Sequence, residues 1–128
     1  MRDASWCFAC GQDNPIGLRL RFTPEGDQVR AEVTLGREYQ GYEGVLHGGI
    51  ITAALDDAMA NLAHLRGQEA LTARLDVRFR RPAPVDQRLI VTARVTGTRG
   101  RFFTAEAVLA LPDGTPLAEA RGTFIRGG

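Results

Sequence analysis

The residues best suited to chemistry lie in the stretch HGGIITAALDDAM, residues 47 to 59. Gly48 and Gly49 open a segment with helical periodicity, so the first backbone N–H groups of that helix have no partner within it, and glycine leaves them accessible. The positive end of the helix dipole strengthens their attraction for a carbonyl oxygen that gains negative charge. We therefore interpret the two glycines as an oxyanion hole. The alternative is a glycine turn that only lets the chain enter a crowded helix.

An acid follows at a suitable spacing. Asp56 comes seven residues after Gly49, about two helical turns, so both lie on nearly the same side of the helix. Asp57 is rotated by roughly 100° from it, toward Asn61 and His64. We predict Asp56 as the catalytic carboxylate, and the alternative is a hydrogen-bonded structural acid.

The same spacing separates the two groups along the helix. Seven residues correspond to about 10 Å, too far for Gly49 and Asp56 of one chain to touch one reacting carbonyl. Two helices packed antiparallel about a two-fold axis would bring the start of one beside Asp56 of the other. Alanines on the helix surface would permit this approach. The sequence therefore predicts an obligate homodimer with two composite sites.

The rest of the chain alternates like strands. Period-two patterns and turn residues predict a hairpin over residues 16 to 35, and a helical face runs from Gly48 to about Arg66. Further strands are expected at residues 71–81, 88–98, 101–111 and 117–126. The predicted fold is an α+β domain in which an antiparallel sheet wraps around one long central helix. Residues 1–15 form a lead segment and residues 16–128 the single domain.

Composition bounds the partners. The chain has sixteen arginines, no lysine and fifteen acidic residues, which gives a net charge of +1. The overall charge therefore favours binding to neither nucleic acid nor an anionic membrane. No run of about twenty apolar residues is present, and the first residues lack the apolar stretch of a signal peptide. We expect a soluble cytoplasmic protein.

The only two cysteines, Cys7 and Cys10, are spaced C-x-x-C. Such a pair supplies half of a zinc site or a redox couple when the remaining groups are present. The other soft ligands of the chain, His47 and His64, are distant in sequence. We therefore interpret the cysteines as packing the lead segment, and we predict no metal site and no cofactor.

Several motifs together resemble one family. The LHGG segment, the aspartate nine residues after the histidine, the alanine-rich helix and LDVRFRRPAPVDQRL look like the hot-dog-fold acyl-CoA thioesterases of the phenylacetate-pathway (PaaI-like) type. The likeness covers roughly residues 16 to 126, and CFACGQDNPIGLRLRF resembles the lead segment of some members. The resemblance implies hydrolysis of an acyl-CoA thioester and a hot-dog fold.

The resemblance also implies residue roles. Asp56 matches the family's catalytic acid, acting as general base or as nucleophile, and Gly48 and Gly49 match the oxyanion donors. His47 matches the motif histidine, whose part is to organise the loop. Thr72 falls where some relatives have a serine. Its parity in the strand puts it on the face away from the helix, where it would contact a neighbouring subunit.

One position departs from the family. Several relatives place an asparagine six residues before the motif histidine to orient water, and this chain has Gly41 there. Gln40 and Glu43 are the nearby candidates to replace it.

The expected substrate adds further candidates. Arginines near the site would meet the anionic nucleotide end of acyl-CoA. Ile51, Leu55 and Met59 would line an acyl pocket or be ordinary core. The homodimer is expected to assemble further into a homotetramer. The candidate arginines are Arg74, Arg78, Arg80 and Arg81.

Two other functions compete with hydrolysis. The missing asparagine is compatible with a non-catalytic acyl-CoA-binding hot-dog protein. A purely structural dimer is the third interpretation, in which Asp56 is a buried acid that destabilises the folded chain.

Overall fold

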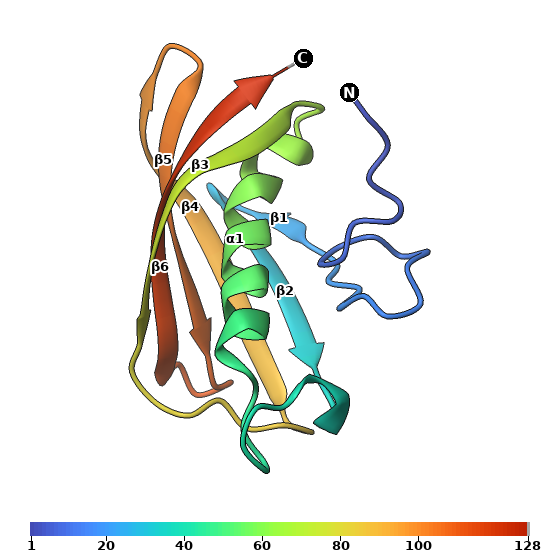
Figure 1. The fold of residues 1–128 in the computed structure, drawn as a ribbon. Helices are drawn as coiled ribbons and strands as arrows, with labels where there is room; N and C mark the ends of the chain where they lie inside the picture. The colour runs from blue at the N-terminus through green and yellow to red at the C-terminus, as the bar shows by residue number, and fades with distance from the viewer. Residues whose placement is uncertain (128) are drawn as a thin grey trace.

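A computed structural model describes residues 1–127 as a curved antiparallel sheet wrapped around one helix (Figure 1). Its six strands lie in the order β1-β2-β4-β5-β6-β3, so β1 and β3 form the two edges. The bounds are β1 (Thr23–Glu25), β2 (Gln28–Thr34), the short 3-10 helix η1 (Arg37–Tyr39), α1 (Gly48–His64), β3 (Glu69–Phe79), β4 (Arg88–Arg99), β5 (Phe102–Ala110) and β6 (Pro116–Gly127). The predicted α+β fold is confirmed.

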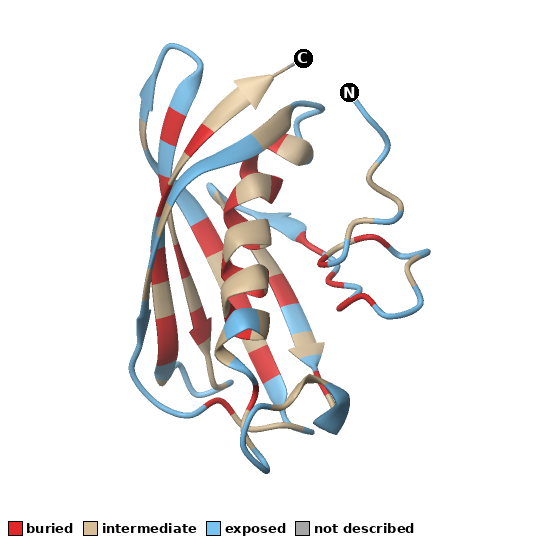
Figure 2. Cartoon of the chain, in the orientation of Figure 1, coloured by how far each residue is buried: buried red, intermediate tan, exposed pale blue. Residues whose placement is uncertain are grey.

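Helix α1 lies across the concave side of the sheet. Its apolar residues recur every three or four positions, so one face packs on the strands. Leu55, Ala58 and Met59 have no exposed surface at all. Behind them Phe103 and Phe124 stack with ring centroids 5.2 Å apart. Figure 2 shows buried and less buried positions alternating along the strands, as a sheet with one covered face requires.

The predicted hairpin over residues 16 to 35 is displaced. Its alternating residues Leu18, Leu20 and Phe22 are buried, but they lie before β1 rather than in a strand. The N–H groups of Leu18 and Leu20 donate to the carbonyls of Phe8 and Ala9, at 2.8 and 2.9 Å. The partner of this segment is therefore the N-terminal lead, and the sheet begins only at Thr23.

Strand β3 contains a β-bulge. Thr72 pairs with Phe124, whereas Arg74 pairs with Thr123, so Ala73 is an extra residue. A bulge shifts the alternation of side chains by one position. Thr72 therefore shares the helix-facing side of the sheet with Phe124, and the prediction that it faces away from α1 is wrong.

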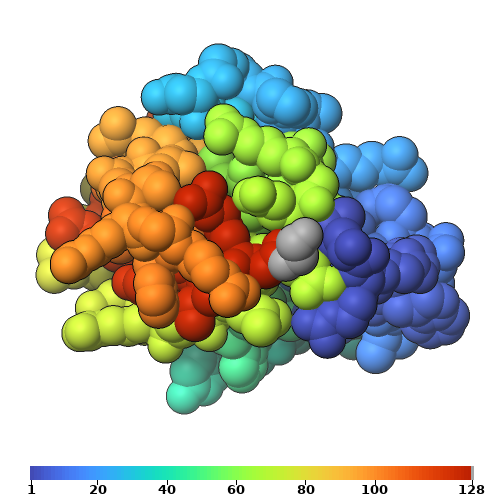
Figure 3. Space-filling view, turned by 90° about the horizontal axis from the view of Figure 1, so that it is seen from above, coloured from blue at the N-terminus to red at the C-terminus, as the bar shows by residue number. Residues whose placement is uncertain are grey.

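The N-terminal segment lies on the side of α1 opposite β5 and β6, as Figures 1 and 3 show from two directions. Tyr39 fastens it to the loop before the helix, because its hydroxyl donates to the carbonyls of Ile16 and Gly17, at 3.2 and 3.1 Å. The helix thus has the sheet on one side and the lead segment on another.

Within residues 1–127, no helix is long and apolar enough to cross a membrane.

Candidate active site

His47 caps the start of α1. Its backbone is extended, its Nδ1 accepts a hydrogen bond from the Gly49 N–H at 2.8 Å, and its carbonyl accepts from Ile50 and Ile51. The cap satisfies one of the N–H groups that a helix start leaves open. The Gly49 N–H is therefore already engaged by the histidine of its own chain.

The Gly48 N–H is placed differently. No hydrogen bond from it is found in residues 1–127. A Cβ at Gly48 would meet the Phe79 ring at 3.5 Å, whereas one at Gly49 would meet His47 Nδ1 at 3.0 Å. Phe79 is half exposed at the end of β3. At the start of the helix, the Gly48 backbone N–H is thus available as a hydrogen-bond donor near the Phe79 ring.

Asp56 lies at the middle of α1 and is partly buried. Its Oδ1 accepts a hydrogen bond of 2.6 Å from the Thr72 hydroxyl. Thr72 reaches the helix because of the bulge in β3. Its contact is with Asp56 of its own chain, which corrects the prediction that Thr72 turns toward a neighbouring subunit. The hydroxyl holds the carboxylate in one orientation.

Asp57 faces the N-terminal segment. The thiols of Cys7 and Cys10 donate to its Oδ1 at 3.7 and 3.6 Å, and the Asn61 side-chain amide donates to its Oδ2 at 3.1 Å. Asn61 is the single buried polar residue of the described core, 4 % exposed. The two adjacent aspartates therefore serve different sides of the helix.

Burial dominates the electrostatics of this second group. It raises the pKa of the Asp57 carboxyl above its usual value; the thiol hydrogen bonds act in the opposite direction, and the neighbouring Asp56 charge raises it further. Burial likewise raises the pKa of the Cys10 thiol, and the Asp57 charge adds to the rise. Burial thus shifts the pKa of both groups in the same direction, upward.

The loop before the helix contains the candidates for positioning water. Gln40 Oε1 accepts a hydrogen bond from the Gly44 N–H at 3.2 Å, so this side chain closes its own loop. Glu43 is exposed in the turn beyond it. Gly41 lies against His47, because a Cβ at Gly41 would meet the His47 Cα and Cδ2 at 3.5 and 3.7 Å. The position that departs from the family is therefore adjacent to the motif histidine.

The candidate arginines lie along and just after β3, outside the helix-facing side. Arg74 lines a hollow of about 450 Å³ on the outer face of the sheet, together with Arg121 and Glu106. Arg78 and Arg80 line a second hollow, where Arg80 pairs with Glu119 at 3.0 Å. Arg81 is exposed just after the strand. Arg74 and Arg78 are thus on the face of β3 that is directed away from Asp56.

The acyl-pocket candidates are core residues in the single chain. Ile51, Leu55 and Met59 are 5 %, 0 % and 0 % exposed, and all three belong to the hydrophobic cluster. In the single chain they therefore fit the second alternative, ordinary core.

Residues 43–118 match the family model described as thioesterase superfamily. The chain belongs to the thioesterase superfamily. The match begins in the loop before His47 and continues through α1, β3, β4 and β5 into β6. It includes Asp56 and Thr72 but not the Cys7–Cys10 segment.

Relatives of this thioesterase superfamily chain include the bovine (Bos taurus) protein named acyl-coenzyme A thioesterase THEM4. It is 27% identical over 122 residues, which cover 93% of this chain and 50% of the relative. The mouse (Mus musculus) protein of the same name is 28% identical over 92 residues, covering 71% of this chain and 40% of the relative. The chain therefore spans half or less of the length of these curated relatives.

Solved structures show the same fold. A thioesterase superfamily protein has a TM-score of 0.83 and 29% identity, covering 90% of this chain and 60% of that one. A hypothetical thioesterase protein from Streptococcus pneumoniae TIGR4, crystallised with coenzyme A, has a TM-score of 0.77 and 14% identity, covering 85% and 86%. The chain has the hot-dog fold of the superfamily.

Sequence reasoning missed the contact between Asp57 and the two cysteines. They are 50 and 47 residues apart, so no local spacing connects them. The sequence offers one weak signal. Asp57 lies on a helix face that carries Asn61 and His64, which indicates a polar neighbour without identifying it.

Proposed function

We propose that this chain is an acyl-CoA thioesterase that hydrolyses a thioester to a free acid and CoA. The observation that carries the proposal is the Asp56 carboxylate. It is partly buried, held at 2.6 Å by Thr72 and borne on a helix that starts with Gly48 and Gly49. A carboxylate fixed in this way can act on water or on a carbonyl carbon without reorganising.

Two routes are compatible with such a carboxylate. As general base, Asp56 takes a proton from water, the water oxygen bonds to the carbonyl carbon, and the C–S bond breaks. The thiolate then leaves and takes up the proton. As nucleophile, Asp56 forms a mixed anhydride with release of the thiol, and water hydrolyses the anhydride. Both routes consume one water and give one acid and one thiol.

The developing oxyanion needs donors at the helix start. The Gly48 N–H is the better placed of the two, because His47 already accepts the Gly49 N–H at 2.8 Å. A substrate oxygen would compete with His47 for the Gly49 N–H. His47 would then serve by orienting the loop rather than by transferring a proton.

We infer that the site is composite. Gly49 and Asp56 are about 10 Å apart along one helix, so the donors and the carboxylate that act on one carbonyl come from two subunits. Strand β3 supports this inference, since it is an edge strand that exposes Leu71 and Phe79, 60% and 53%. An edge of this kind is usually covered. Pairing of two β3 strands about a two-fold axis would cover it and bring the helices antiparallel.

The arginines are proposed to bind the phosphates of CoA. Arg80 and Arg81 follow the end of β3, so a CoA that leaves the site at this end of the strand can reach them while its thioester meets Asp56. Arg74 and Arg78 line hollows on the outer face of β3. One guanidinium group can donate two parallel hydrogen bonds to the oxygens of one phosphate. We also propose a homotetramer of two dimers in the cytoplasm, to be checked by light scattering and by fractionation of cells.

Thiol release from a panel of acyl-CoAs tests the proposal. The wild type is expected to release free thiol from at least one substrate, and Asp56→Asn is expected to abolish the release with an unchanged circular dichroism spectrum. Asp113→Asn is the matched control, because Asn retains the turn contact of Asp113 with the Thr115 N–H at 2.9 Å. Equal activity of Asp56→Asn and wild type would refute the role of Asp56.

Mixed dimers test the composite site. Chains with Asp56→Asn and chains with Gly48→Leu, which places a side chain against Phe79, should each be inactive. Co-expressed with two different tags and purified through both, the heterodimer should recover up to half of the activity per dimer, because one of its two sites is intact. An inactive heterodimer would mean that both groups act within one chain.

Gly41 favours one alternative, a protein that binds acyl-CoA without cleaving it. The water-orienting asparagine of several relatives is absent there, and Gln40 is engaged in its loop. Calorimetric binding of a non-hydrolysable thioether analogue, combined with no thiol release from any acyl-CoA, would establish this alternative.

A further inference from the structure

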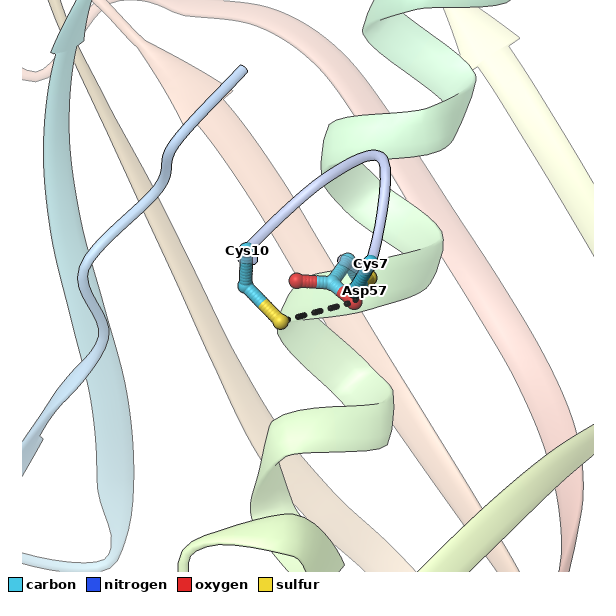
Figure 4. A group of neighbouring side chains, drawn as sticks. All are labelled: Cys7, Cys10 and Asp57. Atoms are coloured by element: carbon cyan, nitrogen blue, oxygen red, sulfur yellow. Dashed lines mark hydrogen bonds between the residues drawn. The ribbon is translucent and has the colours of Figure 1, made fainter. Parts of the chain in front are cut away.

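Three potential metal ligands from distant parts of the chain meet beside α1. Figure 4 shows Cys7 and Cys10 on the N-terminal loop with Asp57 of the helix between them. Their ligand atoms all lie within 4.8 Å of one another. The Cys7 and Cys10 sulfurs are 3.7 and 3.6 Å from Asp57 Oδ1. Neither cysteine forms a disulfide in the described chain.

The spacing agrees with a tetrahedral metal site. Zinc binds sulfur at about 2.3 Å and carboxylate oxygen at about 2.0–2.2 Å, which puts neighbouring sulfur and oxygen ligands about 3.6 Å apart. We propose that Cys7, Cys10 and Asp57 bind one Zn²⁺ ion. This proposal does not depend on the chemistry assigned to Asp56.

The carboxylate is oriented by a buried amide. Asn61, 4 % exposed, donates to Asp57 Oδ2 at 3.1 Å and to the Asp57 carbonyl at 2.9 Å. Oδ1 is thereby left to face the two sulfurs. Second-sphere contacts of this kind fix the orientation of metal ligands.

The cysteine loop is also fixed without an ion. The Gly11 N–H donates to the Cys7 carbonyl at 2.9 Å, and the Gln12 side-chain amide donates to the Cys10 carbonyl at 3.0 Å. A Cβ at Gly11 would lie 2.4 Å from the Cys7 nitrogen, so only glycine fits this turn. Both sulfurs are therefore presented to Asp57 by a tight backbone turn.

A fourth ligand position remains open. The three side chains line one side of a hollow of about 220 Å³, which is also lined by His64 and by residues 1–4. A water molecule can occupy the fourth position of a zinc site with three protein ligands. The site is thus reached from solvent, which gives an ion a path to it.

The ligand set selects the ion. Thiolates favour Zn²⁺ over Mg²⁺ and Ca²⁺, which prefer oxygen ligands. The positive charge of the ion also offsets the cost of placing two sulfurs against a carboxylate. The ion would fasten the N-terminal loop to the helix that carries Asp56, so its binding energy would stabilise the folded chain.

Cobalt titration tests the proposal. The full chain, kept reduced and stripped with a chelator that is then removed, is titrated with Co²⁺. One equivalent per chain is expected to produce a thiolate-to-cobalt charge-transfer band in the near ultraviolet, and added Zn²⁺ should abolish it. Zn²⁺ should also raise the midpoint of thermal unfolding of the stripped protein.

Three variants locate the site. Cys10→Ser and Asp57→Asn should each weaken Co²⁺ binding at least tenfold, and Cys10→Ser should also weaken the charge-transfer band. Asp56→Asn is the matched control and should bind Co²⁺ as the wild type does, since its carboxylate contacts Thr72 instead. Asp57→Asn replaces one carboxylate oxygen by an amide group of nearly the same size. It therefore gives a result even where a cysteine variant fails to fold.

Two outcomes would overturn the site. One is a reduced, folded wild type that shows no charge-transfer band at saturating Co²⁺. The other is a band whose affinity is the same in Asp57→Asn as in the wild type.

Discussion

Asp56 and Asp57 are adjacent in sequence, but their carboxylates have different partners. Asp56 receives one hydroxyl hydrogen bond, from Thr72 of strand β3. Asp57 receives two thiols from the N-terminal loop and an amide from its own helix. One residue along a helix is a rotation of roughly 100°. That rotation is enough to assign one acid to the open edge of the sheet and the other to the buried side of the lead segment.

The difference lies in how much each carboxylate is already satisfied. Burial and several donors hold Asp57, and burial raises its pKa. Within the described residues Asp56 accepts one side-chain hydrogen bond, from Thr72, and it otherwise faces the edge where a second subunit is proposed to pack. A carboxylate with free acceptor capacity beside an uncovered edge can act on a substrate, whereas a saturated one serves structure.

Replacing each acid in turn should give the largest effect. Asp56→Asn is expected to lower kcat by about 10²- to 10⁴-fold, the range attributed to a general acid or base. Asp57→Asn should lower it by less than about tenfold, through reduced stability. Steady-state thiol release from one acyl-CoA measures both variants. A larger loss in Asp57→Asn than in Asp56→Asn would reverse the assignment of the two acids.

The buried side can be disrupted from the loop that serves it. Gly11→Ala is expected to destabilise the chain by about 1–3 kcal/mol, the usual cost of overpacking, because its Cβ would lie 2.4 Å from the Cys7 nitrogen. Urea unfolding with a chelator present measures this loss without any contribution from an ion.

Gly127→Ala is the control for that loss. Nothing lies within 4 Å of a Cβ there, so its free energy of unfolding should stay within about 0.5 kcal/mol of the wild type. Similar stability of the two variants would show that the turn at Gly11 relaxes readily.

The hydroxyl that holds Asp56 should have a smaller effect. Thr72→Val removes the donor and keeps the shape of the side chain. A hydrogen bond to a charged group contributes about 1.5–3 kcal/mol, so kcat should fall about tenfold or more. KM should change little, because the hydroxyl holds the carboxylate and not the substrate.

Thr72→Ser is the rescue variant, since it restores the hydroxyl and should recover most of kcat. A fall in KM and kcat together, or no rescue by serine, would mean that Thr72 acts through packing of β3 rather than through Asp56.

Much of the fold could be predicted from the sequence. Helix α1 begins at Gly48 as predicted and ends at His64, two residues before the expected Arg66. Strands β3 to β6 lie within about two residues of their predicted ranges. These elements are long and largely periodic, and most of their buried apolar residues pack toward one helix, so local pattern and tertiary packing agree.

The errors share a physical cause, which is a partner far away in sequence. Leu18 and Leu20 alternate like a strand, but their N–H groups bond to the lead segment. The bulge at Ala73 reverses the parity of Thr72, and no residue type in that stretch signals it. Asp57 meets Cys7 across 50 residues. Periodicity describes which face a side chain takes, but it does not identify what lies opposite.

The smallest effect expected is a gain at Gly41. Gly41→Asn restores the residue that several relatives use to orient water, and a Cβ there meets His47 at 3.5 Å or more, an ordinary contact. If water is poorly positioned in this chain, kcat should rise by a few fold, about 1 kcal/mol in the barrier. Gly41→Ala is the control and should give no gain.

The direction of this change distinguishes two accounts of the open side of the helix. A gain would mean that Asp56 and Thr72 already hold the carboxylate correctly and that water alone was limiting. A loss in both Gly41 variants would mean that the loop must stay unsubstituted beside His47, and that Gln40 or Glu43 orients the water. Gln40→Ala then gives the answer for Gln40: since its side chain accepts from the Gly44 N–H, a fall in kcat with unchanged stability would assign it to the reaction rather than to the loop.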